Sequence, residues 1–369
     1  MANSPYPRRG RIATFPPPPV FQSMAMHLRL FSSDSGSPPP IDPLPVDAVR
    51  PLFSVMLPTR EPDERLCHAL RSVLAQAIPP EAMQITVVDD ASRPGLTRRL
   101  VAAVDTEGRV DLVECEERLG LAGNWNRAIR LARGRLVHLL HQDDYVLPGF
   151  YDRMQHGFAS AANVGMAFSR TRIIDEGLRT KKLSSRPRWL PGVITDWLQR
   201  IAERQRIQTP AAVVARGTYE SVGGYRPELR QALDWEMWVR IAARFPVWYE
   251  PRVLAVYRRH PGNESARLSR SGQLWPDIAR AIGIIADTLP AHLRERVTVS
   301  SVRWHTASAL RTVERLLAVG ASDQAAETLA QIPELLRLLG ERPLHGGHTV
   351  HRRLAELRAR VLGSGRRAA

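Results

Sequence analysis

Short apolar runs alternate with amphipathic stretches over residues 53–160. The run Phe53–Thr59 is mostly apolar, and similar runs end at residues 88, 113 and 140. Runs of this length predict buried strands. Between them, apolar residues recur every three or four positions over residues 63–76, 96–104 and 121–133, which predicts amphipathic helices. This alternation predicts an α/β fold with a doubly wound, mostly parallel sheet.

Capping and breaking residues mark the expected helix ends in this region. Ser92 is placed to cap the helix at 96–104. Gly134 is expected to end the helix before it, and Pro148 to lie in the first turn of the next helix. Helix boundaries are therefore expected close to these three residues.

The pattern changes beyond about residue 164. Shorter strands are expected at 164–168, 211–214 and 253–257, around a helix at 235–245. From residue 274 onward apolar residues recur at helical spacing without a persistent repeat. The C-terminal part is therefore expected to be a helical appendage.

Composition divides the chain into three parts. Residues 1–50 hold 11 of the 29 prolines, which favours a disordered tail. Residues 51–268 carry the α/β pattern, and residues 269–369 the helical one. The sequence therefore predicts a proline-rich tail, a main domain and a helical C-terminal region.

Charge and hydropathy limit the classes of function. The formal net charge is +15, but the basic residues are scattered arginines, so no nucleic-acid partner is expected. Apolar runs are too short for a spanning helix, and no secretory signal is apparent. Cys67 and Cys115 lie outside any metal-ligand spacing and fit reduced thiols. A cytoplasmic protein is expected, and its charge would suit peripheral contact with the inner face of a membrane.

Two pairs of carboxylates end two of the predicted strands. Asp89 and Asp90 follow the run 85–88, and Asp143 and Asp144 follow the run 135–140. Ligands bind at the carboxyl ends of strands in such sheets. Hard cations such as Mg²⁺ take oxygen ligands and share them with substrate phosphates. The pairs therefore suggest a nucleotide-diphosphate site, although each pair alone could be a turn or a helix cap.

Several segments, in order, resemble those of family 2 glycosyltransferases with the GT-A fold. The resemblance covers about residues 52–265 and rests on the following stretches: 53–59, 87–92, 126–134, 141–144, 223–225, 233–240 and 257–265. It implies an inverting transferase that uses a divalent cation, Mn²⁺ or Mg²⁺. The donor would be a nucleotide-sugar, and the acceptor a saccharide or a lipid-linked molecule in surface polysaccharide or glycolipid synthesis.

The resemblance also implies roles for individual residues. Asp234 would be the catalytic base, with Glu236 as the rival, and Asp144 and His260 would bind the metal. The implied nucleotide-sugar contacts are Pro58, Thr59, Glu61, Asp89, Asp90, Asn126, Asp143 and Arg258.

The chain departs from the family pattern at three positions, which are His141, Leu233 and Arg60. These departures leave open a catalytically degenerate module of the same fold, which would bind a nucleotide or a partner. No G-x-G-x-x-G follows the first strand, and no Walker motif is present, which disfavours dehydrogenases and P-loop ATPases.

Overall fold

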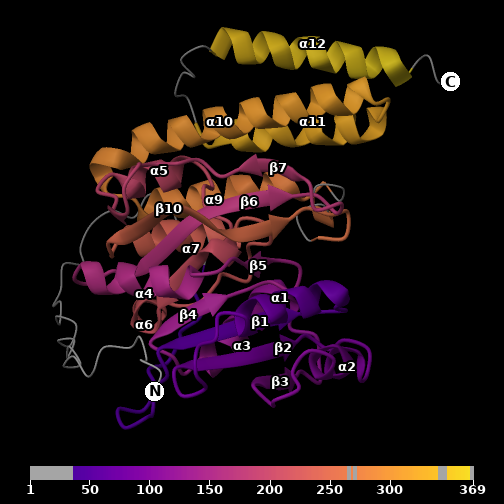
Figure 1. Ribbon diagram of the computed structural model, residues 1–369. Helices are drawn as coiled ribbons and strands as arrows, with labels where there is room; N and C mark the ends of the chain where they lie inside the picture. The colour runs from indigo at the N-terminus through magenta and orange to yellow at the C-terminus, as the bar shows by residue number, and fades with distance from the viewer. Residues whose placement is uncertain (1–35, 264–266, 269–271, 340–346, 366–369) are drawn as a thin grey trace, which may run out of the picture. The chain divides into compact units, whose positions relative to one another are not determined.

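A computed structural model describes residues 36–263, 267–268, 272–339 and 347–365, and of residues 347–351 and 362–365 it describes the backbone alone. Figure 1 shows an α/β region followed by C-terminal helices. The strands are β1 (Phe53–Thr59), β2 (Met83–Asp89), β3 (Val110–Glu114), β4 (Leu136–Leu139), β5 (Tyr145–Val146), β6 (Met166–Ile174), β7 (Thr180–Leu183), β8 (Gly192–Val193), β9 (Ala212–Ala215) and β10 (Val247–Arg258). The helices are α1 (Glu64–Leu74), α2 (Leu96–Ala102), α3 (Gly120–Leu131), α4 (Phe150–Ser160), α5 (Trp197–Glu203), η1 (Thr209–Ala211), α6 (Arg216–Val222), α7 (Leu233–Ala242), α9 (Leu274–Thr288), α10 (Ala291–Ala318), α11 (Ser322–Arg337) and α12 (Gly347–Gly365).

The described strands form one mixed sheet, with the order β3-β2-β1-β4-β9-β6-β10-β5 along its main path. The pairs β1–β2, β2–β3, β1–β4 and β6–β10 are parallel, whereas β9 is antiparallel to both β4 and β6. Every residue of β1 is buried, as expected for a central strand covered on both faces. The mostly parallel sheet predicted from the sequence is confirmed.

Gly134, which follows α3, lies against the backbone of β1. A Cβ atom there would lie 2.5 Å from the backbone of Phe53 and Ser54. The preceding helix, α3, ends at Leu131, and Gly134 donates its N–H to the Ser54 hydroxyl at 2.7 Å. Gly134 therefore lets the chain enter β4 directly beside β1.

Two predicted helix starts are wrong. Gly95, not Ser92, precedes α2, with a left-handed φ of 72°. The Ser92 hydroxyl instead donates to Asp89 Oδ1 at 2.5 Å. Gly149, with φ of 81°, precedes α4, so Pro148 lies just outside the helix. In both cases a glycine turns the chain into the helix.

Residues 36–50 are not part of a disordered tail, which corrects the predicted boundary at residue 50. Ile41 is 2% exposed and packs in the main core. The carbonyl oxygen of Pro39 accepts the N–H of Gly224 at 2.7 Å, and that of Asp42 accepts Arg216 Nη2 at 3.1 Å. Residues 1–35 of the predicted tail, like residues 264 and 265 at the end of the last family motif, lie outside the described residues.

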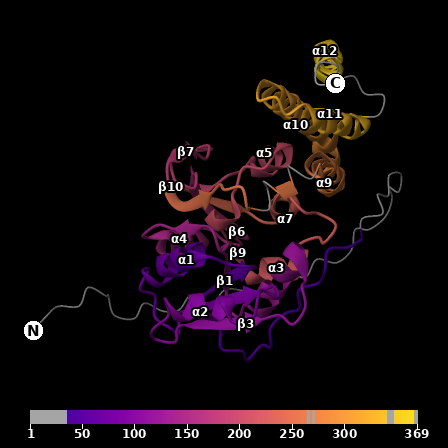
Figure 2. The same ribbon diagram turned by 90° about the vertical axis from the view of Figure 1, so that its right-hand side faces the viewer.

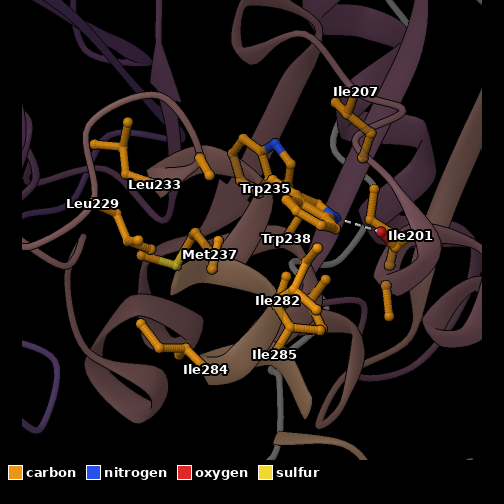
Figure 3. Packing of buried hydrophobic residues seen from close by; sticks show 14 of the residues in the cluster. Ile201, Ile207, Leu229, Leu233, Trp235, Met237, Trp238, Ile282, Ile284 and Ile285 are labelled. Atoms are coloured by element: carbon orange, nitrogen blue, oxygen red, sulfur yellow. Dashed lines mark hydrogen bonds between the residues drawn. The ribbon is translucent and has the colours of Figure 1, made fainter. Parts of the chain in front are cut away.

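The C-terminal helices share one apolar core with the α/β region. Ile282, Ile284 and Ile285 of α9 pack in the same cluster as Trp235 and Met237 of α7 (Figure 3). Burying a side chain such as isoleucine stabilises a fold by roughly 1.5–3 kcal/mol. Helix α9 is therefore part of the main hydrophobic core and packs against α7. None of the described helices is long and apolar enough to cross a membrane.

Candidate active site

A cavity of about 1150 Å³ opens at the carboxyl ends of β1 and β4. We call it the site cavity. Its wall comes from segments far apart in the sequence: 58–61, Arg65, Asp90, 118–125, 141–143, most of 205–209 and 227–235, Tyr257, His260, Gly262, Asn263, Arg267 and parts of α9 and α10. Parallel strands place their carboxyl ends at one edge, so the loops that follow them meet there. Such a volume is large enough for a nucleotide and a sugar.

Three potential metal ligands lie together after β4. Side-chain ligand atoms of His141, Asp143 and Asp144 all lie within 4.8 Å of one another. His260 Nε2 lies 2.9 Å from Asp143 Oδ2, and so it contacts this cluster through Asp143. The cluster contains the predicted ligand Asp144 and has His260 beside it, so the ligand pair of Asp144 and His260 stays a prediction, to which His141 and Asp143 are added as candidates.

Asp144 is the deepest of the three. Its side chain is fully buried, and Oδ1 accepts the backbone N–H of Arg258 at 2.9 Å. Oδ2 lies 3.5 Å from His141 Nδ1 and has no hydrogen-bond partner among the described residues. Burial, together with the neighbouring charge of Asp143, raises the pKa of Asp144 to about 7.

In both neighbours of Asp144, nearby charges outweigh the effect of burial on the pKa. Burial acts to raise the pKa of Asp143, but His260 and His141 outweigh it and lower the pKa. Burial acts to lower the pKa of His141, but the nearby carboxylates of Asp144 and Asp143 raise it. Two carboxylates and an imidazole, with one buried oxygen unpartnered, form a donor set suited to Mg²⁺ or Mn²⁺.

Asp234 lies in the wall of the same cavity, at the start of α7. Oδ1 accepts the N–H of Trp235 at 2.7 Å, and Oδ2 accepts the Thr209 hydroxyl at 3.3 Å. Burial raises the pKa of Asp234 to about 6, although these hydrogen bonds oppose the shift. A carboxylate with such a pKa suits general base catalysis near neutral pH.

The ring of Trp235, the residue after Asp234, is held by two contacts. Trp235 Nε1 donates to the carbonyl oxygen of Ile201 at 2.6 Å (Figure 3). The ring also lies against His305 of α10, with centroids 5.0 Å apart. The base candidate is therefore held between α5 and the C-terminal helices.

Glu236, the rival base, lies outside the cavity wall. Its side chain is 1% exposed and accepts two hydrogen bonds from Arg240, at 2.7 and 2.9 Å. Arg226 lies 3.3 Å away on the same carboxylate. Because its oxygens bind the buried Arg240 and the partly buried Arg226, Glu236 is held in an ion-pair network, and of the two candidate bases only Asp234 faces the cavity.

The two residues of the first carboxylate pair, Asp89 and Asp90, have different surroundings. Asp89 accepts hydrogen bonds from the backbone and hydroxyl of Ser92 and from Thr97 Oγ1, and it is not part of the cavity wall. Asp90 lines the cavity and accepts the N–H groups of Leu119 and Gly120 at 2.6 and 3.1 Å. Asp89 thus shapes the loop, whereas Asp90 fixes the start of α3 in the wall.

Pro58, Thr59 and Glu61 line the cavity at the end of β1. Thr59 donates its hydroxyl to Gln142, which joins this loop to the carboxylate cluster. Glu61 has a positive φ of 45°, and its carboxylate binds Arg93 through the backbone and side chain at 2.9 and 2.7 Å.

Two predicted contacts, Asn126 and Arg258, lie behind the cavity. Asn126 is 4% exposed and exchanges two hydrogen bonds with the backbone of Tyr225, at 2.7 and 2.8 Å. Arg258 is 6% exposed, and its Nη2 atom lies 3.5 Å from His68 Nδ1. Both residues hold segments that form the site and are absent from its wall.

Sequence patterns did not reveal the support given by Asp277 of α9. Its carboxylate accepts the N–H groups of Arg230, Gln231 and Ala232 at 2.9, 2.7 and 2.9 Å. These residues directly precede α7 and Asp234. The only local signal, an acid in the first turn of a helix, is also typical of ordinary helix caps.

The chain is similar to known proteins in both structure and sequence. The chain has a TM-score of 0.59 with the crystal structure of S. aureus TarS 1-349 in complex with UDP-GlcNAc, at 15% identity, covering 85% of this chain and 88% of that one. This likeness shows a glycosyltransferase fold of the GT-A type. Residues 54–221 match the family model for Glycosyl transferase family 2.

Two curated relatives extend the match. Over 235 residues the chain is 30% identical to uncharacterized protein MT1568 of Mycobacterium tuberculosis, covering 60% of this chain and 72% of that protein. Over 219 residues it is 26% identical to succinoglycan biosynthesis protein ExoU of Rhizobium meliloti, covering 55% and 61%. The chain belongs to glycosyl transferase family 2 and is a glycosyltransferase.

Proposed function

We propose that this protein is a metal-dependent, inverting glycosyltransferase that moves a sugar from a nucleotide-diphosphate donor to an acceptor hydroxyl. The observation that supports it most is the placement of the carboxylate cluster and Asp234 around one cavity of about 1150 Å³. The name of ExoU, a succinoglycan biosynthesis protein, supports a saccharide or lipid-linked acceptor in polysaccharide synthesis.

The donor would occupy the side of the cavity formed by β1 and α3. Pro58, Thr59 and Glu61 would contact the nucleotide, and Asp90 would hold the backbone N–H groups of the α3 start in place. Asp89, Asn126 and Arg258 would act through the segments that they hold.

The cation would bind to His141, Asp143 and Asp144, with His260 orienting Asp143. Mg²⁺ or Mn²⁺ bound there would offset the negative charge that grows on the departing diphosphate. Because the free Asp144 has a raised pKa, the cluster would release a proton when it binds the cation.

Asp234 would accept the proton of the acceptor hydroxyl as that oxygen attacks the anomeric carbon. Attack from the face opposite the diphosphate inverts the configuration at this carbon. Thr209 and the N–H of Trp235 hold the carboxylate in place before the reaction. Transfer of a proton to a positioned base accelerates such steps by roughly 10²–10⁴-fold.

Calorimetric titration tests the proposal directly. UDP, GDP, dTDP and CMP are titrated into wild-type protein with and without Mn²⁺, and hydrolysis of the matching nucleotide-sugar is then followed. Asp143→Ala should weaken metal-dependent binding by roughly tenfold or more. Asp234→Asn should keep the binding and lose hydrolysis.

Asp111→Ala provides a matched control, because Asp111 is an exposed acid on β3 outside the cavity. It should leave both readouts unchanged. Binding of no nucleotide, or binding that is indifferent to Mn²⁺ and to Asp143→Ala, would contradict the proposed chemistry.

A further inference from the structure

The segment 178–190 is basic and carries exposed apolar side chains. We call it the basic segment. It contains Arg179, Lys181, Lys182, Arg186 and Arg188 and no acidic residue. It starts at the turn before β7, which pairs with β6 off the main path of the sheet. Figure 2 shows β7 at the outer edge of the strands.

Large apolar side chains are exposed at unusual density here. Leu178, Leu183, Trp189 and Leu190 are 56%, 42%, 79% and 70% exposed. They are four of the nine large apolar residues that are exposed in the described part of the chain. Exposed apolar side chains scattered singly need no explanation, but a concentration of them marks an interaction surface.

Basic and apolar groups are interleaved within the segment. The Arg186 guanidinium lies 4.5 Å from the centroid of the Trp189 ring. All four residues of β7 are exposed, including Lys181 and Lys182. The nearest acids along the chain are Asp175, which lies 2.8 Å from Lys181, and Glu176. The positive charge therefore exceeds the negative charge even when these two acids are counted.

We propose that the basic segment docks this glycosyltransferase on an anionic membrane surface. Lysine and arginine would bind lipid headgroups, while Trp189 and the leucines enter the interface between headgroups and acyl chains. Tryptophan is favoured at such interfaces because its ring is apolar and its N–H is polar. Exposed leucines have no stacking role on nucleic acid, which favours lipid as the occupant.

The basic segment is connected to the site cavity, which indicates what docking would do for the enzyme. Ile174 of β6 pairs with Thr180 of β7, in the basic segment. The carbonyl oxygen of Ile174 accepts the N–H of Arg259 at 2.8 Å, directly before His260 in the cavity wall. Docking would bring the cavity toward acceptors in the membrane. The docking itself does not rest on the proposed transfer chemistry.

Vesicle co-sedimentation tests the proposal with the full chain. The probes are vesicles of phosphatidylcholine alone and vesicles that also contain phosphatidylglycerol, at low and high salt. Wild-type protein should bind only the anionic vesicles, and more weakly at high salt. Each basic side chain near such a surface contributes about fivefold in affinity, so Lys181→Gln with Lys182→Gln should weaken binding roughly 30-fold.

The apolar part is tested by Trp189→Ala with Leu190→Ala, which should reduce binding at both salt concentrations. Arg98→Gln with Arg99→Gln on α2 is the control with equal loss of charge, and it should bind as wild type does. Circular dichroism and nucleotide titration establish that each variant is folded.

Three results would overturn the proposal. The first is that wild-type protein does not bind anionic vesicles. The second is that the basic-segment variants bind as tightly as wild type. The third is that duplex DNA displaces the protein fully from the vesicles.

Discussion

Replacing Asp234 with asparagine should stabilise the fold at neutral pH and remove transfer activity. Burial raises the pKa of this carboxyl from 3.8 to about 6. At about 1.36 kcal/mol per pH unit, holding the carboxylate ionised in the folded state costs roughly 3 kcal/mol. Asparagine keeps a carbonyl oxygen for the N–H of Trp235 and carries no charge, so it should recover roughly 1–3 kcal/mol at neutral pH.

The size of this effect depends on pH. Below about pH 4 the carboxyl is protonated in both the folded and unfolded states, and ionisation costs nothing. Between about pH 4 and 6 the unfolded chain releases its proton first, so the folded state binds more protons and stability falls as pH rises. Above about pH 6 the loss is complete. The advantage of the Asp234→Asn variant should therefore be small near pH 4 and largest above pH 7.

Urea unfolding of both proteins at pH 4.5 and 7.5, without metal or nucleotide, measures this difference. In parallel, kcat/KM of the wild type should rise with pH through about 6, and the variant should lose about 100- to 10,000-fold in rate. Equal stabilities at pH 7.5, or a variant that is less stable there, would refute the argument that burial raises this pKa. A variant that retains full activity would remove Asp234 from the role of base.

Three further substitutions test the framework of the site, each by urea unfolding and nucleotide titration. Glu236→Gln should cost about 3–5 kcal/mol, because it leaves the charge of Arg240 buried without its partner; a neutral result would contradict the ion-pair role. Asn126→Ala should cost about 2–3 kcal/mol by orphaning the buried backbone groups of Tyr225. Asp277→Ala should cost about 3 kcal/mol and lower kcat more than nucleotide affinity, since three N–H groups before the base lose their acceptor; unchanged kcat would show that this anchor is dispensable.

The α/β core was accessible to sequence reasoning because its signals are local. Each strand of the first half is a short apolar run, and the helices between them have clear apolar faces. The convergence of Asp90 and Asp143 on one cavity follows from strand ends that meet at one edge, whereas Asp234 reaches the cavity from the start of α7.

The features that could not be predicted depend on contacts between distant residues. Nothing local distinguishes Asp89, which is satisfied by Ser92 and Thr97, from its neighbour Asp90 in the cavity wall. The proline-rich composition of residues 36–50 gave no sign that Pro39 and Ile41 pack on the folded domain. Asp277 is remote in sequence from the loop that it holds, and only tertiary structure brings the two together.

The anchor at Asp277 also determines where this enzyme can be divided. A shortened chain that ended at residue 268 would retain every predicted catalytic residue and still lose the acceptor for the loop before Asp234. It would also uncover the apolar face of α7 that α9 buries. Chimeras that exchange the helical region between relatives should therefore place the junction after α9, so that the loop and its anchor are inherited together.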